Sequence, residues 1–244
     1  MCVSDGHGSS KCFRSDKGSQ FAVEAGLLNL SWALRSLSND LTTLQQTAEE
    51  ILPRSIARSW QESVKLDLLE SPFTGEEREA VVQASGLEAW QAVQQNPMHA
   101  YGATLLATAA NTHVMITFQL GDGDILQVND RGAVSRINAK QTIQFGEETA
   151  SLCLPDAWKQ IDVMFKVLDE RPPALALLST DGYSNSFKSE TGFLRVGGDI
   201  LEIIREEGTD SLSASLPKWL EEASRLGSGD DVTLGLIVTP SAAL

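Results

Sequence analysis

Four short segments that join aspartate to glycine lie far apart in the chain and could together bind a cation. They are Ser4-Asp5-Gly6-His7-Gly8, Gly121-Asp122-Gly123-Asp124, Ser179-Thr180-Asp181-Gly182 and Ser228-Gly229-Asp230-Asp231. Three of the four lie beside a run of residues typical of a β-strand. Because glycine has no side chain, a neighbouring aspartate can turn inward and leave space for an ion and its waters. Several carboxylates gathered in this way favour Mg²⁺ or Mn²⁺, so the pattern predicts a metal-dependent hydrolase.

Each aspartate also has an interpretation that involves no chemistry. Taken singly, Asp5 and Asp181 could be turn residues whose side chains hydrogen-bond the backbone at a strand end. Either Asp122 or Asp124 could simply end a strand. Asp231, next to Asp230 in sequence, is better explained as a hydrogen-bonding or capping group than as a ligand.

The cysteines and histidines suggest no clear second site. Cys2, Cys12 and Cys153 include no C-x-x-C pair, and their odd number argues against a disulfide framework. A zinc ion on Cys2, His7 and Cys12 is an alternative, although this spacing matches no structural zinc motif. His7 lies between two glycines, whose exposed backbone makes a core histidine difficult to explain. We therefore favour a functional role for His7.

The size and charge of the chain limit the classes of protein to consider. Its 244 residues, 42% of them hydrophobic, can bury a full core as one domain over residues 1–244. The formal charge of −14 suits solubility and argues against binding along a nucleic-acid backbone. The sequence shows no signal-peptide pattern and no window of about 18 apolar residues that could span a membrane. We expect a cytoplasmic protein with no nucleic-acid or membrane partner.

The order of the expected elements favours an α+β fold. Neither βαβ alternation nor a Gly-rich phosphate or dinucleotide loop is found, so an antiparallel sheet core with helices outside fits best. We expect helices from Ser19 onward, at 40–69 with a division at Pro53, from the N-cap Thr74 to Gln95, at 158–168, at 198–207 and at 212–226. We expect strands at 1–4, 101–109, 113–120, 125–128, 134–137, 174–178 and 232–238.

Together, five motifs resemble those of the metal-dependent protein phosphatase family of the PP2C type. In chain order they are Val3-Ser4-Asp5-Gly6-His7-Gly8, Gly102-Ala103-Thr104-Leu105-Leu106, Gly121-Asp122-Gly123-Asp124, Ser179-Thr180-Asp181-Gly182 and Gly229-Asp230-Asp231-Val232-Thr233. One such motif alone is weak evidence, because Asp-Gly pairs are common in turns. Five in this order cover nearly the whole chain, and residues 5–24 with Asn96-Pro97 resemble the bacterial branch.

The resemblance implies a two-layer antiparallel β-sandwich flanked by helix pairs, an α-β-β-α arrangement with a two-metal site at one end. It makes Asp5 the bridging ligand of the catalytic site and gives the carbonyl group of Gly6 a contact to one ion. Asp181 and Asp230 match further ligands, bound directly or through water. Asp122 matches an acid that helps to hold a third, weaker ion in some members.

The implied activity is the hydrolysis of phosphoserine and phosphothreonine in proteins by water that Mn²⁺ or Mg²⁺ activates. His7 matches a residue thought to protonate the leaving alcohol, a task that suits a side chain titrating near neutral pH. No cysteine motif of the C-x5-R type is present, so a covalent phosphoenzyme is not required. The expected partners are phosphorylated proteins, with a cognate serine/threonine kinase as a further candidate.

Arg14 is the residue that we consider for phosphate binding. It forms a local basic cluster with Lys11 and Lys17, close in sequence to the first motif. A guanidinium group makes planar, bidentate contacts to phosphate. A solvated surface position explains the same cluster, and we favour this interpretation over a phosphate role.

The chain departs from the family pattern at its start. Family members usually begin well before the Asp-Gly-His-Gly segment, with additional strands and an acidic metal ligand. We therefore expect an N-terminally truncated member in which residues 40–95 form a helical insertion before the central strands. Loss of a carboxylate weakens a hard-cation site, so a non-catalytic phosphatase-like binding module is the main alternative. A hydrolase of small phosphate esters is a third hypothesis.

Overall fold

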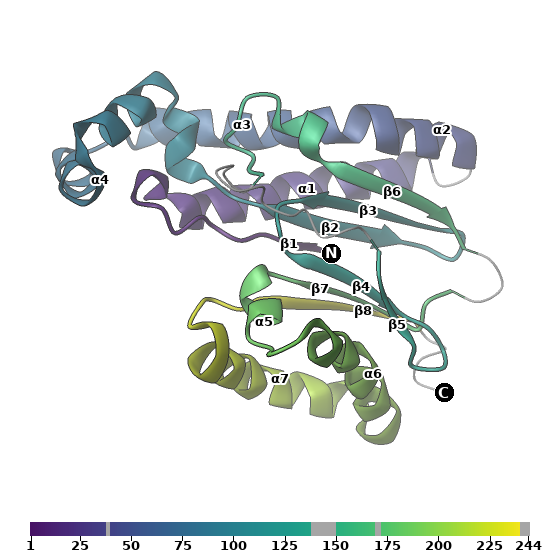
Figure 1. Ribbon diagram of the computed structural model, residues 1–244. Helices are drawn as coiled ribbons and strands as arrows, with labels where there is room; N and C mark the ends of the chain where they lie inside the picture. Colours follow the sequence, from purple (N-terminus) through teal and green to yellow (C-terminus); the bar gives the residue numbers. More distant parts are fainter. Residues whose placement is uncertain (38–39, 138–149, 169–171, 240–244) are drawn as a thin grey trace.

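Two β-sheets stacked face to face form the centre of the computed structural model, which describes residues 1–37, 40–137, 150–168 and 172–239 (Figure 1). Within these residues each sheet has four antiparallel strands. The first sheet contains, in spatial order, β1 (Cys2–Val3), β2 (Leu105–Ala110), β3 (Val114–Leu120) and β6 (Asp162–Val167). The second contains β5 (Val134–Arg136), β4 (Asp124–Val128), β7 (Leu175–Ser179) and β8 (Leu234–Val238).

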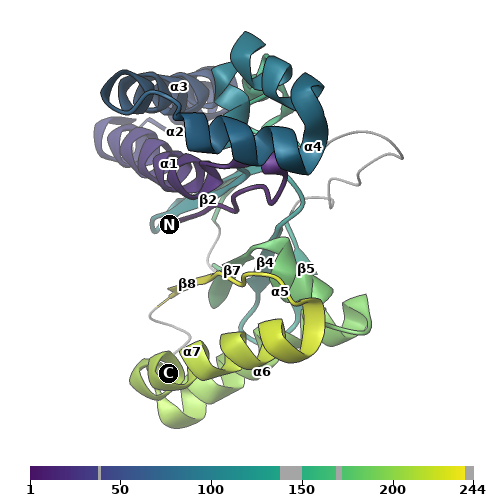
Figure 2. The same ribbon diagram turned by 90° about the vertical axis from the view of Figure 1, so that its left-hand side faces the viewer.

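Helices cover the outer faces of both sheets, as Figures 1 and 2 show from two directions. On the side of the first sheet lie α1 (Ser15–Leu37), α2 (Leu41–Gln46), α3 (Leu52–Glu70) and α4 (Gly75–Gln95). On the side of the second lie α5 (Asp181–Asn185), α6 (Glu190–Glu207) and α7 (Thr209–Ala223). Short helical turns are formed by Ser10–Cys12, Thr47–Ile51, Pro97–Tyr101, Ala157–Gln160 and Ser224–Ser228. The predicted α-β-β-α sandwich is therefore confirmed.

Strand β3 shows how the layers share one core. All seven of its residues, Val-Met-Ile-Thr-Phe-Gln-Leu, are buried, because one face packs under the helices and the other faces the second sheet. Alternate side chains such as Ile116 and Phe118 join the helix-side core. A smaller cluster between the sheets consists of Val3, Leu106, Ile125 and Leu178.

Helix α1 approaches the segment before β2 closely because Gly18 has no side chain. A Cβ at this position would clash with the carbonyl group of Tyr101. The carbonyl oxygen of Gly18 accepts a hydrogen bond of 2.9 Å from Nε1 of the buried Trp60 on α3. These contacts fix α1 and α3 against the segment that leads into β2.

Local sequence signals explain several helix starts. Thr74 and Glu77 form a capping box: the Glu77 amide donates to Thr74 Oγ1 at 3.1 Å, and the Thr74 amide donates to the Glu77 carboxylate at 2.7 Å. Pro53 lies in the first turn of α3, where proline is well tolerated. The N-cap predicted at Thr74 and the division predicted at Pro53 are confirmed.

The helix predicted at 158–168 is wrong. Only Ala157–Gln160 forms a short helical turn, and Asp162–Val167 is the edge strand β6. This segment pairs with β3, for example Val163 with Phe118, and its Val163 and Phe165 pack against the helix-side core. Helix α5 was not expected, and α6 starts at Glu190, earlier than the glycine-containing sequence suggested.

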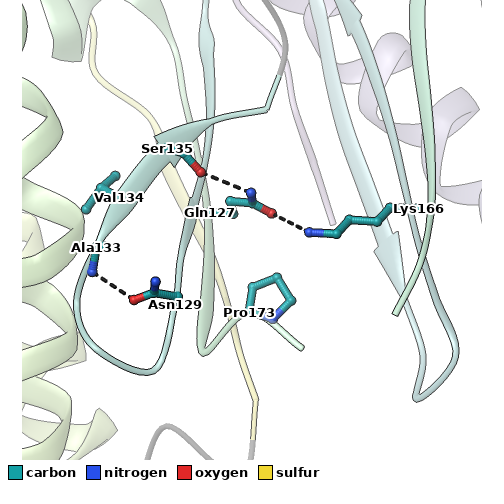
Figure 3. A pocket seen from close by; sticks show the side chains of 7 residues that line it. All are labelled: Gln127, Asn129, Ala133, Val134, Ser135, Lys166 and Pro173. Atoms are coloured by element: carbon teal, nitrogen blue, oxygen red, sulfur yellow. Dashed lines mark hydrogen bonds between the residues drawn. The ribbon is translucent and has the colours of Figure 1, made fainter. Parts of the chain in front are cut away.

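A pocket of about 300 Å³ lies between the β4–β5 hairpin, β6 and the segment before β7 (Figure 3). It is lined by Gln127, Asn129, Ala133, Val134, Ser135, Lys166 and Pro173. Lys166 of β6 donates to Gln127 Oε1 at 3.3 Å, and Gln127 Nε2 donates to Ser135 Oγ at 3.0 Å. These bonds connect the first sheet to the β4–β5 hairpin of the second. In the described ranges no helix combines the length and apolar character needed to cross a membrane.

Candidate metal centre

Three of the predicted ligands meet at one end of the sandwich. Carboxylate oxygens of Asp5, Asp181 and Asp230 lie within 4.8 Å of one another. Asp5 follows β1, Asp181 begins α5 directly after β7, and Asp230 precedes β8. In the part of the chain that the structure describes, no other group of three acidic, histidine or cysteine side chains meets this spacing. The strand ends therefore place these carboxylates as the motif pattern predicts.

Antiparallel pairing with the segment before β2 holds Asp5 in position. The Asp5 amide donates to Thr104 Oγ1, and the Thr104 amide donates to the Asp5 carbonyl oxygen, both at 2.9 Å. Two residues later, the His7 amide donates to the Gly102 carbonyl oxygen at 3.0 Å. The backbone of the first motif is thus fixed on both sides of Gly6.

Gly6 is required by the close approach of α1. It forms an isolated β-bridge with Ala103. A Cβ on Gly6 would lie 2.7 Å from the carbonyl oxygen of Ser15, the first residue of α1. A larger residue would push this segment away from the helix and move Asp5 with it.

Gly182 allows the loop before β8 to approach α5. A Cβ on Gly182 would lie 3.2 Å from the Cβ of Asp230. The Thr180 amide donates to the Thr233 carbonyl oxygen at 3.1 Å, and the Thr233 amide donates to Thr180 Oγ1 at 3.0 Å. Together, the glycine and the threonine bring Asp230 beside Asp181.

Hydrogen bonds also orient these two carboxylates. Asn185 Nδ2 donates to Asp181 Oδ2 at 3.0 Å. The Asp230 amide donates to Ser228 Oγ at 3.2 Å, while Asp230 Oδ1 accepts from the Asp231 amide at 2.9 Å. Asp231 therefore contributes a backbone hydrogen bond to its neighbour, and its carboxylate is not one of the three that meet.

The electrostatics of the cluster favour a bound cation. Burial, together with the charges of Asp181 and Asp230, raises the pKa of Asp5 to about 7. The pKa of Asp181 is also raised, chiefly by burial and then by the charges of Asp122 and Asp230. Carboxylates that repel one another in this way would be stabilised by a divalent ion that replaces their shared proton. The donor set, which consists of oxygen atoms, fits Mg²⁺ or Mn²⁺.

Asp122 and Asp124 have different environments. Asp122 lies outside the group of three, although its charge raises the pKa of both Asp5 and Asp181. Asp124 is fully buried and forms an ion pair of 2.7 Å with Arg136. Arg136 also contacts Glu190 of α6 at 2.6 Å. Of the two aspartates, Asp124 therefore has a structural role, and Asp122 remains the candidate for a further ion.

His7 follows Asp5 by two residues in the chain, and part of its ring is enclosed. Its Nε2 atom is shielded from solvent, and its Cδ2 atom faces Gly102, 2.8 Å from where a Cβ would lie. A role as proton donor must therefore use Nδ1, or the ring must rotate. A zinc site on Cys2, His7 and Cys12 gains no support, because the group does not meet the spacing of metal ligands among the described residues.

The structure gives Arg14 a structural role in place of the predicted phosphate contact. The residue is 6% exposed. Its guanidinium donates to both Glu77 oxygens at 2.7 and 3.0 Å, to Asp67 at 3.4 Å and to the Tyr101 hydroxyl at 2.7 Å. Further bonds reach the carbonyl oxygens of Ser71 and Pro72. These contacts engage the guanidinium N–H groups that would have to donate to a phosphate. The phosphate prediction is therefore wrong for the described conformation.

Three positioning residues were not singled out from the sequence. They are Thr104, Thr180 and Asn185. Their side chains hydrogen-bond Asp5, the backbone just before β8, and Asp181, respectively. Both threonines occur inside the motifs, but their partners lie in segments remote along the chain. Asn185 could have been found only if α5 had been predicted, because it contacts Asp181 one helical turn away.

The comparison with protein families now gives the class of this protein. The family described as Protein phosphatase 2C matches residues 1–221. Because the match covers most of the chain, the chain belongs to the protein phosphatase 2C family, as its motifs predicted. Among curated protein sequences, none matches this chain significantly.

Solved bacterial phosphatases share the fold at low sequence identity. PppA, described as a key regulatory component of T6SS in Pseudomonas aeruginosa, is 15% identical with a TM-score of 0.53, covering 98% of this chain and 85% of its own. The serine/threonine phosphatase PstP/Ppp of Mycobacterium tuberculosis is 16% identical with a TM-score of 0.52, covering 96% of this chain and 84% of its own. A variant of a bacterial serine phosphatase is 16% identical with a TM-score of 0.53, covering 97% of this chain and 83% of its own. At these identities the comparison establishes the shared sandwich.

Proposed function

We propose that this protein hydrolyses phosphoserine and phosphothreonine in proteins with the help of two Mn²⁺ or Mg²⁺ ions. The observation that carries the proposal is the meeting of Asp5, Asp181 and Asp230 within 4.8 Å at the strand ends. Membership of the protein phosphatase 2C family supports it independently. The expected partners are phosphorylated proteins and a cognate serine/threonine kinase.

In this proposal the aspartates bind the metal ions, and His7 donates the proton. Asp5 would bridge the ions, with Asp181, Asp230 and the Gly6 carbonyl oxygen as further ligands and Asp122 as the acid for a third ion. When bound, such ions lower the pKa of a water and stabilise charge on phosphoryl oxygens. His7 would donate a proton to the departing serine or threonine oxygen, which is a poor leaving group without one. The backbone hydrogen bonds on both sides of Gly6 hold Asp5 and His7 in position for these roles.

Release of phosphate from a phosphothreonine peptide tests the proposal. We expect turnover in the presence of MnCl2 and none after treatment with a chelator, with activity restored by added Mn²⁺. Phosphorylated metabolites, measured in parallel, should be poorer substrates than the peptide. Peptide binding without turnover at saturating metal would instead favour the non-catalytic module. Faster turnover of metabolites would favour the small-ester hydrolase.

Thermal unfolding of the metal-free protein should depend on pH in an unusual direction. The folded-state pKa of Asp5 is raised to about 7 from the ordinary value of 3.8, so its stabilising contribution is complete below pH 4. That contribution is lost as the pH rises through 7, because the folded state must then carry a buried charge. We expect the Tm without metal to fall by several degrees between pH 5 and pH 8, as measured by calorimetry.

Metal should cancel this loss. At pH 8, Mn²⁺ at about 100 times its Kd is expected to stabilise the fold by about 2.7 kcal/mol. Asp5→Asn should flatten the pH dependence and weaken the Mn²⁺ effect, whereas Asp130→Asn, in the exposed hairpin turn at the other end of the sandwich, should preserve both. A Tm that rises steadily from pH 5 to pH 8 without metal would contradict the proposed cluster.

A further inference from the structure

We propose that Cys12 and Cys153 form a redox-active pair that closes to a disulfide when the protein meets a peroxide. Neither residue is in a disulfide in the structure, and both are buried, at 9% and 6% exposure. They lie 141 positions apart in sequence, on the turn Ser10–Cys12 and on the segment that follows residue 150. Neither residue has a part in the proposed metal chemistry.

The two sulfur atoms converge on one point beside Gly102. A Cβ added to Gly102 would lie 2.9 Å from Sγ of Cys12 and 3.4 Å from Sγ of Cys153. Both thiols therefore occupy the space that a side chain at position 102 would fill. Because glycine has no side chain, residue 102 adds no atoms to the space that the two sulfur atoms share, and the side chain that borders this space with them is that of His7.

The backbone on both sides of this point is already fixed. The Arg14 amide donates to the Ala100 carbonyl oxygen at 2.8 Å, which holds the turn that carries Cys12. The Leu152 amide donates to the Ala103 carbonyl oxygen at 2.9 Å, which holds the segment that carries Cys153. Both cysteines are thus anchored, through neighbouring residues, to the same short stretch before β2.

Polar neighbours make Cys153 the better first nucleophile. Its Sγ atom lies 3.3 Å from Ser151 Oγ and 3.9 Å from His99 Nδ1, within the range of hydrogen bonds to sulfur. An imidazole nitrogen can accept the thiol proton, and the thiolate is the reactive form. Cys2 offers a contrast: burial raises its pKa to about 11, and its Sγ lies against Gly26 of α1.

The reaction balances with hydrogen peroxide as the oxidant. The Cys153 thiolate attacks one peroxide oxygen, the O–O bond breaks, and the departing hydroxide takes up the thiol proton as water. The resulting sulfenic acid is attacked by Cys12, an S–S bond forms, and a second water leaves. Two thiols are oxidised by two electrons in total, and one peroxide is reduced to two waters.

Disulfide formation should also disturb His7. The Cδ2 atom of His7 lies 2.8 Å from the same Gly102 position, so the ring packs at the point where the two sulfur atoms converge. Drawing these atoms to bonding distance removes packing that positions the imidazole. A loss of turnover on oxidation rests on the proposed phosphatase function, whereas disulfide formation does not depend on it.

The experiment treats the folded, full-length chain with hydrogen peroxide and maps disulfides by mass spectrometry under non-reducing conditions. We expect one predominant linked peptide pair, Cys12 with Cys153, that dithiothreitol reverses. The oxidised protein should unfold at a Tm several degrees higher, because the bond closes a long loop. Phosphate release, where it is measurable, should fall several-fold and recover on reduction.

Variants separate this pair from general oxidation. Cys2→Ser should form the same disulfide, whereas Cys12→Ser and Cys153→Ser should form none and show no reversible rise in Tm. A failure of the phosphatase assay would leave the mapping and Tm results unaffected. Oxidation of folded protein to sulfinic acid without a Cys12–Cys153 link, or a predominant link to Cys2, would overturn the proposal.

Discussion

Replacing Asp181 by asparagine is expected to lower metal-dependent phosphate release by about 10²-fold or more while leaving the fold intact. The amide is nearly the same size as the carboxylate but carries no negative charge. It would offer the ions one neutral oxygen in place of an anionic ligand. Asn185 already donates to Asp181 Oδ2, so its hydrogen bond would further bias the orientation of the new amide.

The same substitution should make the metal-free protein more stable at pH 8. Asp181 contributes to the charge repulsion that raises the pKa of Asp5, and the neutral amide removes that repulsion. A higher Tm without metal, combined with lost activity and weaker Mn²⁺ binding by calorimetry, would separate ligand loss from unfolding. Asp130→Asn serves as the matched control, since that residue lies in the exposed hairpin turn. Full activity in Asp181→Asn would refute the metal assignment.

The location of the candidate metal centre could be predicted because its residues carry their own local signals. Asp5 and Asp181 each precede a glycine at the end of an apolar strand, and glycine marks where the backbone must approach another segment closely. The structure shows these approaches at Gly6, toward Ser15, and at Gly182, toward Asp230. These short motifs therefore indicated where segments distant in sequence approach one another.

The errors arose where the decisive partner is distant in sequence. The segment Asp162–Val167 was taken for a helix, but its pairing with β3 makes it a strand. The sequence alone also left open whether Asp122 or Asp124 ends a strand, and the ion pair with Arg136 gives Asp124 a structural role. Hydrogen-bond partners of this kind leave no trace in the local pattern, because the same residue types also suit a turn or a metal site.

Arg14 illustrates the same limit and leads to a strong stability prediction. From the sequence it belonged to a surface cluster of basic residues, yet it is buried between α3 and the start of α4. Its guanidinium bonds Glu77 and Asp67 and lies 4.9 Å from the centre of the Phe73 ring. Each of these residues lies far from Arg14 in sequence, so only the folded chain reveals that they surround it.

Replacing Arg14 by methionine is expected to reduce the free energy of unfolding by about 3 kcal/mol, because Glu77 and Asp67 would lose the buried cation that compensates them. For a chain of this length the Tm should fall by about 10 °C. Arg58→Met is the matched control: its ion pair with Glu62 is largely exposed and should change stability by less than about 0.5 kcal/mol. At a temperature where both variants are folded, the KM for a phosphopeptide should remain that of the wild type. An unchanged Tm together with a raised KM would instead return Arg14 to the phosphate-binding role, since the ionic contacts would then be dispensable for the fold.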